Sequence, residues 1–164
     1  MKKRPLSLGL SFLLLVPALG LGQAKKTPPK ETAATPASPS AAAPSLYKRL
    51  GGYDAIAAVT DDFIARLAED KQLNRFLVGL SENSKLRFRQ LVVDQLCQAT
   101  GGPCVYVGRD MKTAHKGLGV TQNDWDLTVQ HLVATLDKFK VPQKEKDELL
   151  AIASSLKADI VEKP

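Results

Sequence analysis

The chain has 164 residues, enough for one domain of ordinary size and an appendage, and its formal net charge is +6 at pH 7. Four of the basic residues, Lys2, Lys3, Arg4 and Lys25, lie near the N-terminus, so the rest of the chain is only mildly basic. The Lys and Arg residues of that part are interspersed with acidic residues and form no stripe with aromatic residues between them. This pattern indicates solvated helix faces and argues against nucleic-acid binding.

The N-terminus has the three parts of a secretory signal peptide. Residues 1–4 are basic, residues 6–21 are largely apolar, and residues 22–24 end in a small residue. The apolar run is interrupted by a proline and is shorter than the ~20 residues that a membrane-spanning helix needs. We therefore predict a signal peptide at residues 1–24, cleavage after Ala24, export to the periplasm and no membrane span after cleavage. An uncleaved N-terminal anchor is the alternative.

Residues 25–44 consist mainly of Lys, Thr, Pro, Ala and Ser. A stretch of this composition buries too little apolar surface to offset the loss of chain entropy, and its five prolines stiffen it. We predict a disordered linker at residues 25–44, followed by one folded domain at residues 45–161.

Apolar residues recur at helical spacing through most of the folded domain, and strand patterns are nearly absent. Four long helices are expected, at residues 54–69, at 84–100, from 121 or 123 to 138, and after Pro142. Asp54 is the expected N-cap of the first helix. Residues 101–103, Gly-Gly-Pro, end the second, because glycine suits a left-handed cap and proline does not continue a helix. The predicted fold class is all-α.

Two registers are possible for the helix at residues 84–100. The favoured register turns inward five apolar residues at i, i+3, i+4 spacing: Phe88, Leu91, Val92, Leu96 and Ala99. The alternative register includes a polar residue and matches the pattern less well: Leu86, Gln90, Val93 and Cys97.

Residues 104–120 are the least regular part of the domain, with three glycines, a short apolar cluster and His115. A bound cofactor would supply order to such a segment, because a ligand that binds only the folded state adds to its stability. Met111 precedes His115 by one helical turn, so a thioether and an imidazole share a face that suits a flat apolar cofactor and its metal. We interpret the other histidine, His131, as a partly exposed residue of an amphipathic helix.

Cys97 and Cys104 are the only cysteines, and they lie seven residues apart across the Gly-Gly-Pro turn. In an oxidising compartment, the end of a helix and the loop that folds back after it can approach within bridging distance. We favour a disulfide over two buried thiols. The spacing fits neither a CxxC redox pair nor a CxxCH motif.

Five short motifs follow one another along the domain: Leu46-Tyr47, Leu50-Gly51-Gly52, Asp62-Phe63, Gly101-Gly102-Pro103 and the run from Gly108 to His115. Their order resembles that of the group I truncated haemoglobins, from residue 45 to about residue 160. The resemblance implies a truncated globin fold, a two-over-two helical sandwich around haem b. It also implies that the two glycine pairs let shortened helices turn, and that His115 is the proximal ligand of the iron.

The resemblance further implies how the cofactor is held. His115 is expected to give its Nε2 to iron and its Nδ1–H to a backbone carbonyl, which fixes the plane of the ring. Arg109 and Lys112 are placed to meet the haem propionates, unless they are ordinary solvated charges. An apolar lining is expected from residues on several helices: Phe63, Phe76, Leu77, Met111, Val120 and Trp125.

On the ligand side of the haem, Ile64 stands where many group I members carry a tyrosine that hydrogen-bonds dioxygen. Three apolar residues of the favoured register are expected nearest the ligand: Phe88, Leu91 and Val92. Gln95, and Gln90 in the alternative register, are the remaining polar candidates. The absence of a histidine on this helix argues against bis-histidine coordination.

Loss of a charge-assisted hydrogen bond worth ~1.5–3 kcal/mol weakens dioxygen retention by roughly ten- to a hundredfold. We therefore expect a pocket whose preference is shifted away from dioxygen storage and towards small gases in general.

Three hypotheses for function follow. The first is reversible binding of a diatomic gas (dioxygen, nitric oxide or carbon monoxide) for oxygen transport, scavenging or sensing. The second is an enzyme on the same scaffold, a nitric oxide dioxygenase or a peroxidase. The expected apolar pocket and the lack of a visible reductase domain argue against the enzyme, which would need a separate reductase. The third is a haemless helical sensor or partner-binding module, which replacement of His115 would leave unchanged.

Overall fold

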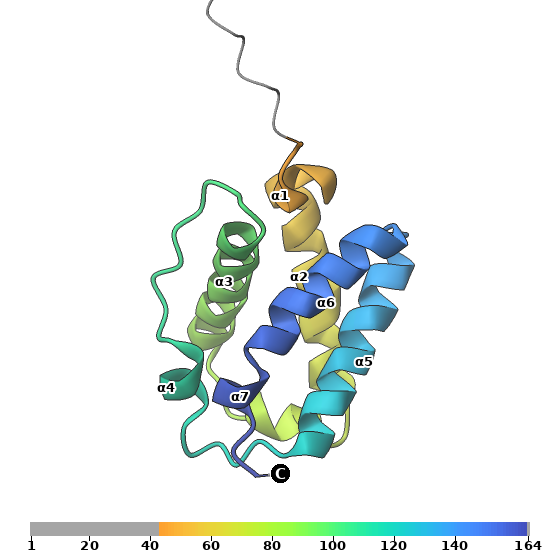
Figure 1. Cartoon of the computed structure of the whole chain (residues 1–164). Coiled ribbons are helices and arrows are strands. Elements are labelled where there is room, and N and C mark those ends of the chain that lie inside the picture. The colour runs from red at the N-terminus through yellow and green to blue at the C-terminus, as the bar shows by residue number, and fades with distance from the viewer. Residues whose placement is uncertain (1–42, 164) are drawn as a thin grey trace, which may run out of the picture. The chain divides into compact units, whose positions relative to one another are not determined.

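The computed structural model describes residues 43–163 (Figure 1). The domain lies within the compact unit Ala41–Pro164. The predicted signal peptide, and all but the last two residues of the predicted linker, lie outside the described residues.

The described residues form an all-α domain, as predicted. Its elements are α1 (Leu46–Arg49), α2 (Gly52–Glu69), the 3₁₀ helix η1 (Leu73–Phe76), α3 (Glu82–Ala99), α4 (Met111–His115), α5 (Gln122–Lys138), α6 (Gln143–Ser155) and α7 (Lys157–Ile160). Residues 43–163 contain no strand, only an isolated parallel bridge between Thr121 and Lys163. Within the same range, no helix is both long enough and apolar enough to cross a membrane.

The limits of α2, α3 and α5 agree with the prediction to within two residues, whereas the fourth predicted helix, expected to include Leu156 and Ile160, is divided into α6 and α7. The start of α2 has a different cause from the predicted one. Gly51, at φ 97°, is the N-cap, and the helix begins at Gly52. Glycine adopts this left-handed conformation without the steric cost of a side chain, so the helix starts earlier than the predicted cap, Asp54. Asp54 lies instead in the first turn, where its charge complements the helix dipole.

Two clusters of buried apolar side chains hold the long helices together. Ile56 of α2 packs with Val93 and Cys97 of α3. The second cluster joins α5 to α6 and consists of Leu132, Leu136 and Leu149. Burying one such leucine contributes roughly 1.5–3 kcal/mol. Two helix pairs result, α2 with α3 and α5 with α6, and α5 also packs against α2 (Figure 1).

The buried face of α3 differs in part from the favoured register. Val93 and Cys97, which belong to the alternative register, are 0% exposed because they face α2. Leu86 and Gln90 of that register are exposed, and so is Ala99, which was expected to face inward. The other members of the favoured register are half-buried: Phe88, Leu91, Val92 and Leu96. The prediction of a single inward face is therefore wrong, because α3 turns one flank to α2 and has a second, partly covered apolar flank.

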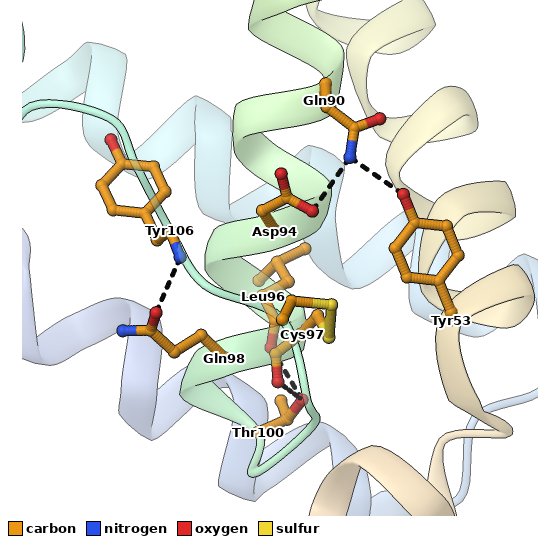
Figure 2. The surroundings of a disulfide bond; sticks show 9 residues. Tyr53, Gln90, Asp94, Leu96, Cys97, Gln98, Thr100 and Tyr106 are labelled. Atoms are coloured by element: carbon orange, nitrogen blue, oxygen red, sulfur yellow. Dashed lines mark hydrogen bonds between the residues drawn. A yellow bond between two sulfur atoms is a disulfide. The ribbon is translucent and has the colours of Figure 1, made fainter.

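A disulfide joins Cys97 of α3 to Cys104 in the loop that follows, and this confirms the expected pairing (Figure 2). The two Cα atoms lie 5.7 Å apart. Gly102 permits the turn between them, because a Cβ there would lie 2.5 Å from the ring of Tyr47 and 2.7 Å from the Sγ of Cys97. The loop that leads to α4 is thus covalently fastened to the end of α3.

Candidate functional site

A cavity of about 150 Å³ lies among α2, η1, α4, α5 and α7. Its lining is mostly apolar: Leu67, Phe76, His115, Leu118, Val120, Asp124, Trp125, Thr128 and Ile160. His115, Asp124 and Thr128 are the polar members. The cavity is therefore an apolar space with one imidazole in its wall.

His115 is the last residue of the five-residue helix α4. Asp110 caps this helix by accepting the N–H of Thr113 at 2.8 Å. The Nδ1 of His115 lies 2.8 Å from the carbonyl oxygen of Met111. A carbonyl oxygen only accepts, so Nδ1 carries a proton, and in the neutral ring the lone pair is then on Nε2. Within residues 43–163 Nε2 has no hydrogen-bond partner, and the half-buried ring is in the tautomer that a metal ligand requires.

The loop that leads into α4 is fixed by Tyr106 as well as by the disulfide. The N–H of Tyr106 donates to the side-chain oxygen of Gln98 on α3 at 2.7 Å (Figure 2), and its hydroxyl donates to the carbonyl oxygen of Arg109 at 2.7 Å. A Cβ at Gly108 would lie 2.2 Å from that hydroxyl oxygen. Burial raises the pKa of Tyr106, so the hydroxyl remains a donor at neutral pH. The start of α4 is therefore positioned from the side of α3.

Asp124, in the wall of the cavity, is a buried carboxylate whose side chain is only 1% exposed. It accepts hydrogen bonds from the side chains of Gln72 (2.7 Å) and Arg75 (2.7 Å), and from the N–H (2.8 Å) and hydroxyl (2.7 Å) of Thr121. Burial alone raises the pKa of Asp124, but these hydrogen bonds outweigh it and hold that pKa well below its usual range. The ionised carboxylate therefore joins the η1 segment to the start of α5.

His131 has a different environment. Its Nε2 lies 2.9 Å from the carboxylate of Asp70, and its side chain is one quarter exposed. The hydrogen bond from His131 is the main cause that lowers the pKa of Asp70. His131 is not among the residues that line the cavity, and it lies at the partly exposed helix position expected for it.

In the part of the chain that the structure describes, no three His, Cys, Asp or Glu side chains are grouped so as to hold a metal ion. A zinc ion in a protein needs three or four such ligands. A single imidazole suits instead a metal that brings its own equatorial ligands, as iron does in a porphyrin. The apolar cavity wall suits the flat face of the same group.

Comparisons with known proteins decide the family. The bacterial-like globin family matches residues 45–162. The chain is 34% identical over 116 residues to the group 1 truncated hemoglobin of Mycolicibacterium paratuberculosis, and this match covers 71% of the chain and 83% of that protein. This chain belongs to the group 1 truncated haemoglobins. A second member, from Synechocystis, is 32% identical over 115 residues, which cover 68% of the chain and 90% of that protein.

Solved structures of truncated haemoglobins have the same fold. The truncated hemoglobin of Tetrahymena pyriformis in its Fe(III) form matches with a TM-score of 0.67 and 25% identity, over 73% of this chain and 100% of that one. The 2/2 hemoglobin of Synechococcus, in the cyanomet state and with covalently attached heme, matches with a TM-score of 0.66 and 29% identity, over the same shares. These matches confirm the predicted two-over-two helical sandwich.

The cofactor of a truncated haemoglobin is haem, and the residues of the cavity fit it. The Nε2 of His115 is available for the iron, and Phe76, Val120 and Trp125 supply apolar wall. Bound haem supplies an iron with a further coordination position for a ligand. The protein would contribute the orientation of the imidazole and the apolar wall.

Four of the predicted site residues meet at the cavity: Phe76, His115, Val120 and Trp125. The other predicted residues are not in its lining. Phe63 packs against the Leu132, Leu136 and Leu149 cluster. Arg109 and Lys112 are exposed. The remaining predicted residues are half-buried on their helices or next to η1: Ile64, Leu77, Phe88, Leu91, Val92 and Met111.

Five lining residues were not predicted from the sequence: Leu67, Leu118, Asp124, Thr128 and Ile160. Leu67 lies three positions after Ile64, so helical periodicity was a usable signal for it. Asp124 was detectable as the third helical residue after Thr121, because the two form a capping box. Leu118 and Ile160 come from a loop and a C-terminal helix, and no local pattern places them at one cavity.

The two polar candidates on α3 are both engaged in hydrogen bonds. Gln90 is exposed and donates to the hydroxyl of Tyr53 and to the carboxylate of Asp94, at 2.9 Å each (Figure 2), so it is removed as a distal candidate. The half-buried Gln95 donates to the Sδ of Met111 at 3.2 Å and links α3 to α4. Gln95 is therefore the remaining polar candidate.

Proposed function

We propose that this truncated haemoglobin reversibly binds diatomic gases at the iron of haem b, with His115 as the proximal ligand. The observation that carries the proposal is the hydrogen bond from Nδ1 of His115 to the carbonyl oxygen of Met111. It leaves the Nε2 lone pair available at an apolar cavity, which is where an axial iron ligand is needed. The haem-bearing relatives support the same role.

Replacement of each histidine in turn tests the proposal. The purified wild-type protein is expected to be red, with a strong Soret band, and to bind carbon monoxide and dioxygen reversibly in the ferrous form. His115→Ala is expected to lose most of its haem. His131→Ala is the matched control, because His131 pairs with Asp70 away from the cavity lining, and it should keep its haem. Unchanged colour and iron content in His115→Ala would refute the proposal.

The preference among gases depends on the distal side. Ile64 and the half-buried apolar residues of α3 offer no hydrogen-bond donor, and the amide of Gln95 is engaged with Met111. Dioxygen is therefore retained weakly, whereas carbon monoxide and nitric oxide depend less on a distal donor. Stopped-flow mixing of the dioxygen complex with nitric oxide distinguishes this role from catalysis. Rapid, repeated nitrate formation in the presence of a reductant would favour a dioxygenase instead.

The proposal includes export to the periplasm. The signal-like residues 1–24 support it, and so does the disulfide, since disulfides persist in oxidising compartments. The mature protein in the periplasmic fraction is expected to begin at Lys25, which its intact mass measures. A mass that includes residues 1–24 would indicate an uncleaved anchor.

A further inference from the structure

The turn that follows His115 contains two glycines in the left-handed conformation, Gly117 at φ 84° and Gly119 at φ 66°. Their N–H groups donate to the two oxygens of one carboxylate. The N–H of Gly117 lies 2.6 Å from one oxygen of Glu162, and the N–H of Gly119 lies 2.6 Å from the other. A bidentate, charge-assisted arrangement of this kind fixes both the position and the direction of the turn.

Glu162 is itself held in place by its own backbone. The N–H groups of Glu162 and Lys163 both donate to the carbonyl oxygen of Val120, at 2.9 and 3.1 Å. The N–H of Gln122 donates to the carbonyl oxygen of Lys163 at 3.0 Å. In Figure 1 the C-terminal end of the chain accordingly lies beside the segment that leads from α4 to α5. The carboxylate is therefore delivered to the turn by a paired backbone segment.

The turn matters because α4 is too short to hold its own position. A helix of five residues is far below the ~12–15 residues at which isolated helices become stable. Its last residue is His115, whose carbonyl oxygen accepts the N–H of Leu118 at 3.0 Å, so the turn begins directly on the histidine. The preceding loop is fastened to α3, and on the side after His115 the carboxylate of Glu162 contacts Gly117 and Gly119.

We propose that Glu162 is a positioning residue for His115: by holding the N–H groups of Gly117 and Gly119, it sets the direction in which the imidazole meets the iron. This inference rests on the proposed haem ligation by His115. It extends the site to the C-terminal residues beyond α7, which come after the predicted end of the domain at residue 161.

The test compares Glu162→Ala and Glu162→Gln with Asp159→Ala in the full-length protein loaded with haem. Asp159 is an exposed acidic residue of α7 and serves as the matched control. For Glu162→Ala we expect a shifted and broadened iron–histidine stretching band in the resonance Raman spectrum of the ferrous protein. We also expect haem transfer to an acceptor apoprotein to be roughly ten- to a hundredfold faster, the usual effect of losing a partner that orients a metal ligand.

The positioning role predicts a graded change of the iron–histidine band in the two variants at residue 162. A role in stability alone does not predict such a change. The amide of Glu162→Gln keeps one acceptor oxygen for two N–H groups, so its band and its transfer rate should lie between those of the wild type and Glu162→Ala. Hydrogen exchange of residues 116–120 should increase in the same order. Asp159→Ala should match the wild type in all three measurements.

The outcomes separate this inference from the proposed function. If His115→Ala keeps its haem, the proposed function fails and the positioning role fails with it. If His115→Ala loses haem but Glu162→Ala and Glu162→Gln keep the wild-type Raman band and transfer rate, only the positioning role is overturned. The positioning role is also overturned if exchange at residues 116–120 rises without any change in the band. If Glu162→Ala does not fold, an intermediate Glu162→Gln supports the proposal and a wild-type Glu162→Gln overturns it.

Discussion

Replacing Cys104 by serine isolates the contribution of the disulfide. Cys104 is half-buried, whereas Cys97 is fully buried, so Cys104→Ser removes the bond without opening a cavity in the α2–α3 core. The bond closes a loop between residues seven apart in the sequence. Restricting a loop of that length in the unfolded chain is worth about 2.4 kcal/mol by the chain-entropy relation. For a domain of this size the expected fall in Tm is on the order of 10 °C.

Thermal unfolding of the mature, haem-saturated protein measures this effect, with and without a dithiol reductant. The wild type should lose stability when it is reduced, and the reduced wild type should unfold close to Cys104→Ser. Cys104→Ser should not respond to the reductant, which makes it the control for effects of the reductant on haem. If Cys104→Ser unfolds within about 2 °C of the oxidised wild type, the loop is held by its other contacts and the reasoning is wrong.

Three further predictions concern single side chains. Asp124→Ala should lower the free energy of unfolding by at least about 2 kcal/mol in chemical denaturation, because each lost hydrogen bond to a charged group costs about 1.5–3 kcal/mol; a smaller loss would show that Arg75 and Gln72 find other partners. Hydrogen bonds from Lys138 and then Arg66 lower the pKa of Asp62 to about 2, so the stability that this carboxylate contributes is present above about pH 4 and is lost as the pH falls towards 2. Lys138→Ala should therefore have a free energy of unfolding at most about 1 kcal/mol below that of the wild type at pH 7, and this difference should shrink towards pH 2. A difference in the free energy of unfolding that stays constant with pH would contradict the prediction. Ile64→Tyr should slow dioxygen release by roughly ten- to a hundredfold in flash photolysis or stopped flow, and equal rates would remove the argument for an apolar distal side.

The sequence predicted the helices well because their ends carry local signals. Thr121 and the Gly-Gly-Pro turn mark helix limits through their own backbone chemistry, and such signals do not depend on the rest of the fold. The register of α3 was harder, since Val93 and Cys97 belong to the register with the weaker apolar pattern and are buried by contact with α2. Counting apolar residues assumes one inward face, and a helix with two apolar flanks violates that assumption.

The same distinction applies to the candidate site. His115 stands out in the sequence, because few other residue types bind iron from one side of a porphyrin. Part of its surroundings does not, because Leu118 and Ile160 come from a loop and a C-terminal helix that meet only in the folded domain. Glu162 is a further case: it lies beyond the last helix, in a short polar tail without periodicity, and only its contacts in the structure reveal it.

The position of His115, the proposed proximal ligand, is thus set by distant parts of the chain. On one side of α4, Cys104 and Tyr106 fasten the incoming loop to α3; on the other, Glu162 holds the outgoing turn. The five-residue helix α4 lies between these two attachments. The orientation of His115 therefore depends on residues far from it in the sequence, although its proposed role as a ligand depends on one side chain. If His115 binds iron as we propose, substitutions outside the cavity lining should change the affinity for haem.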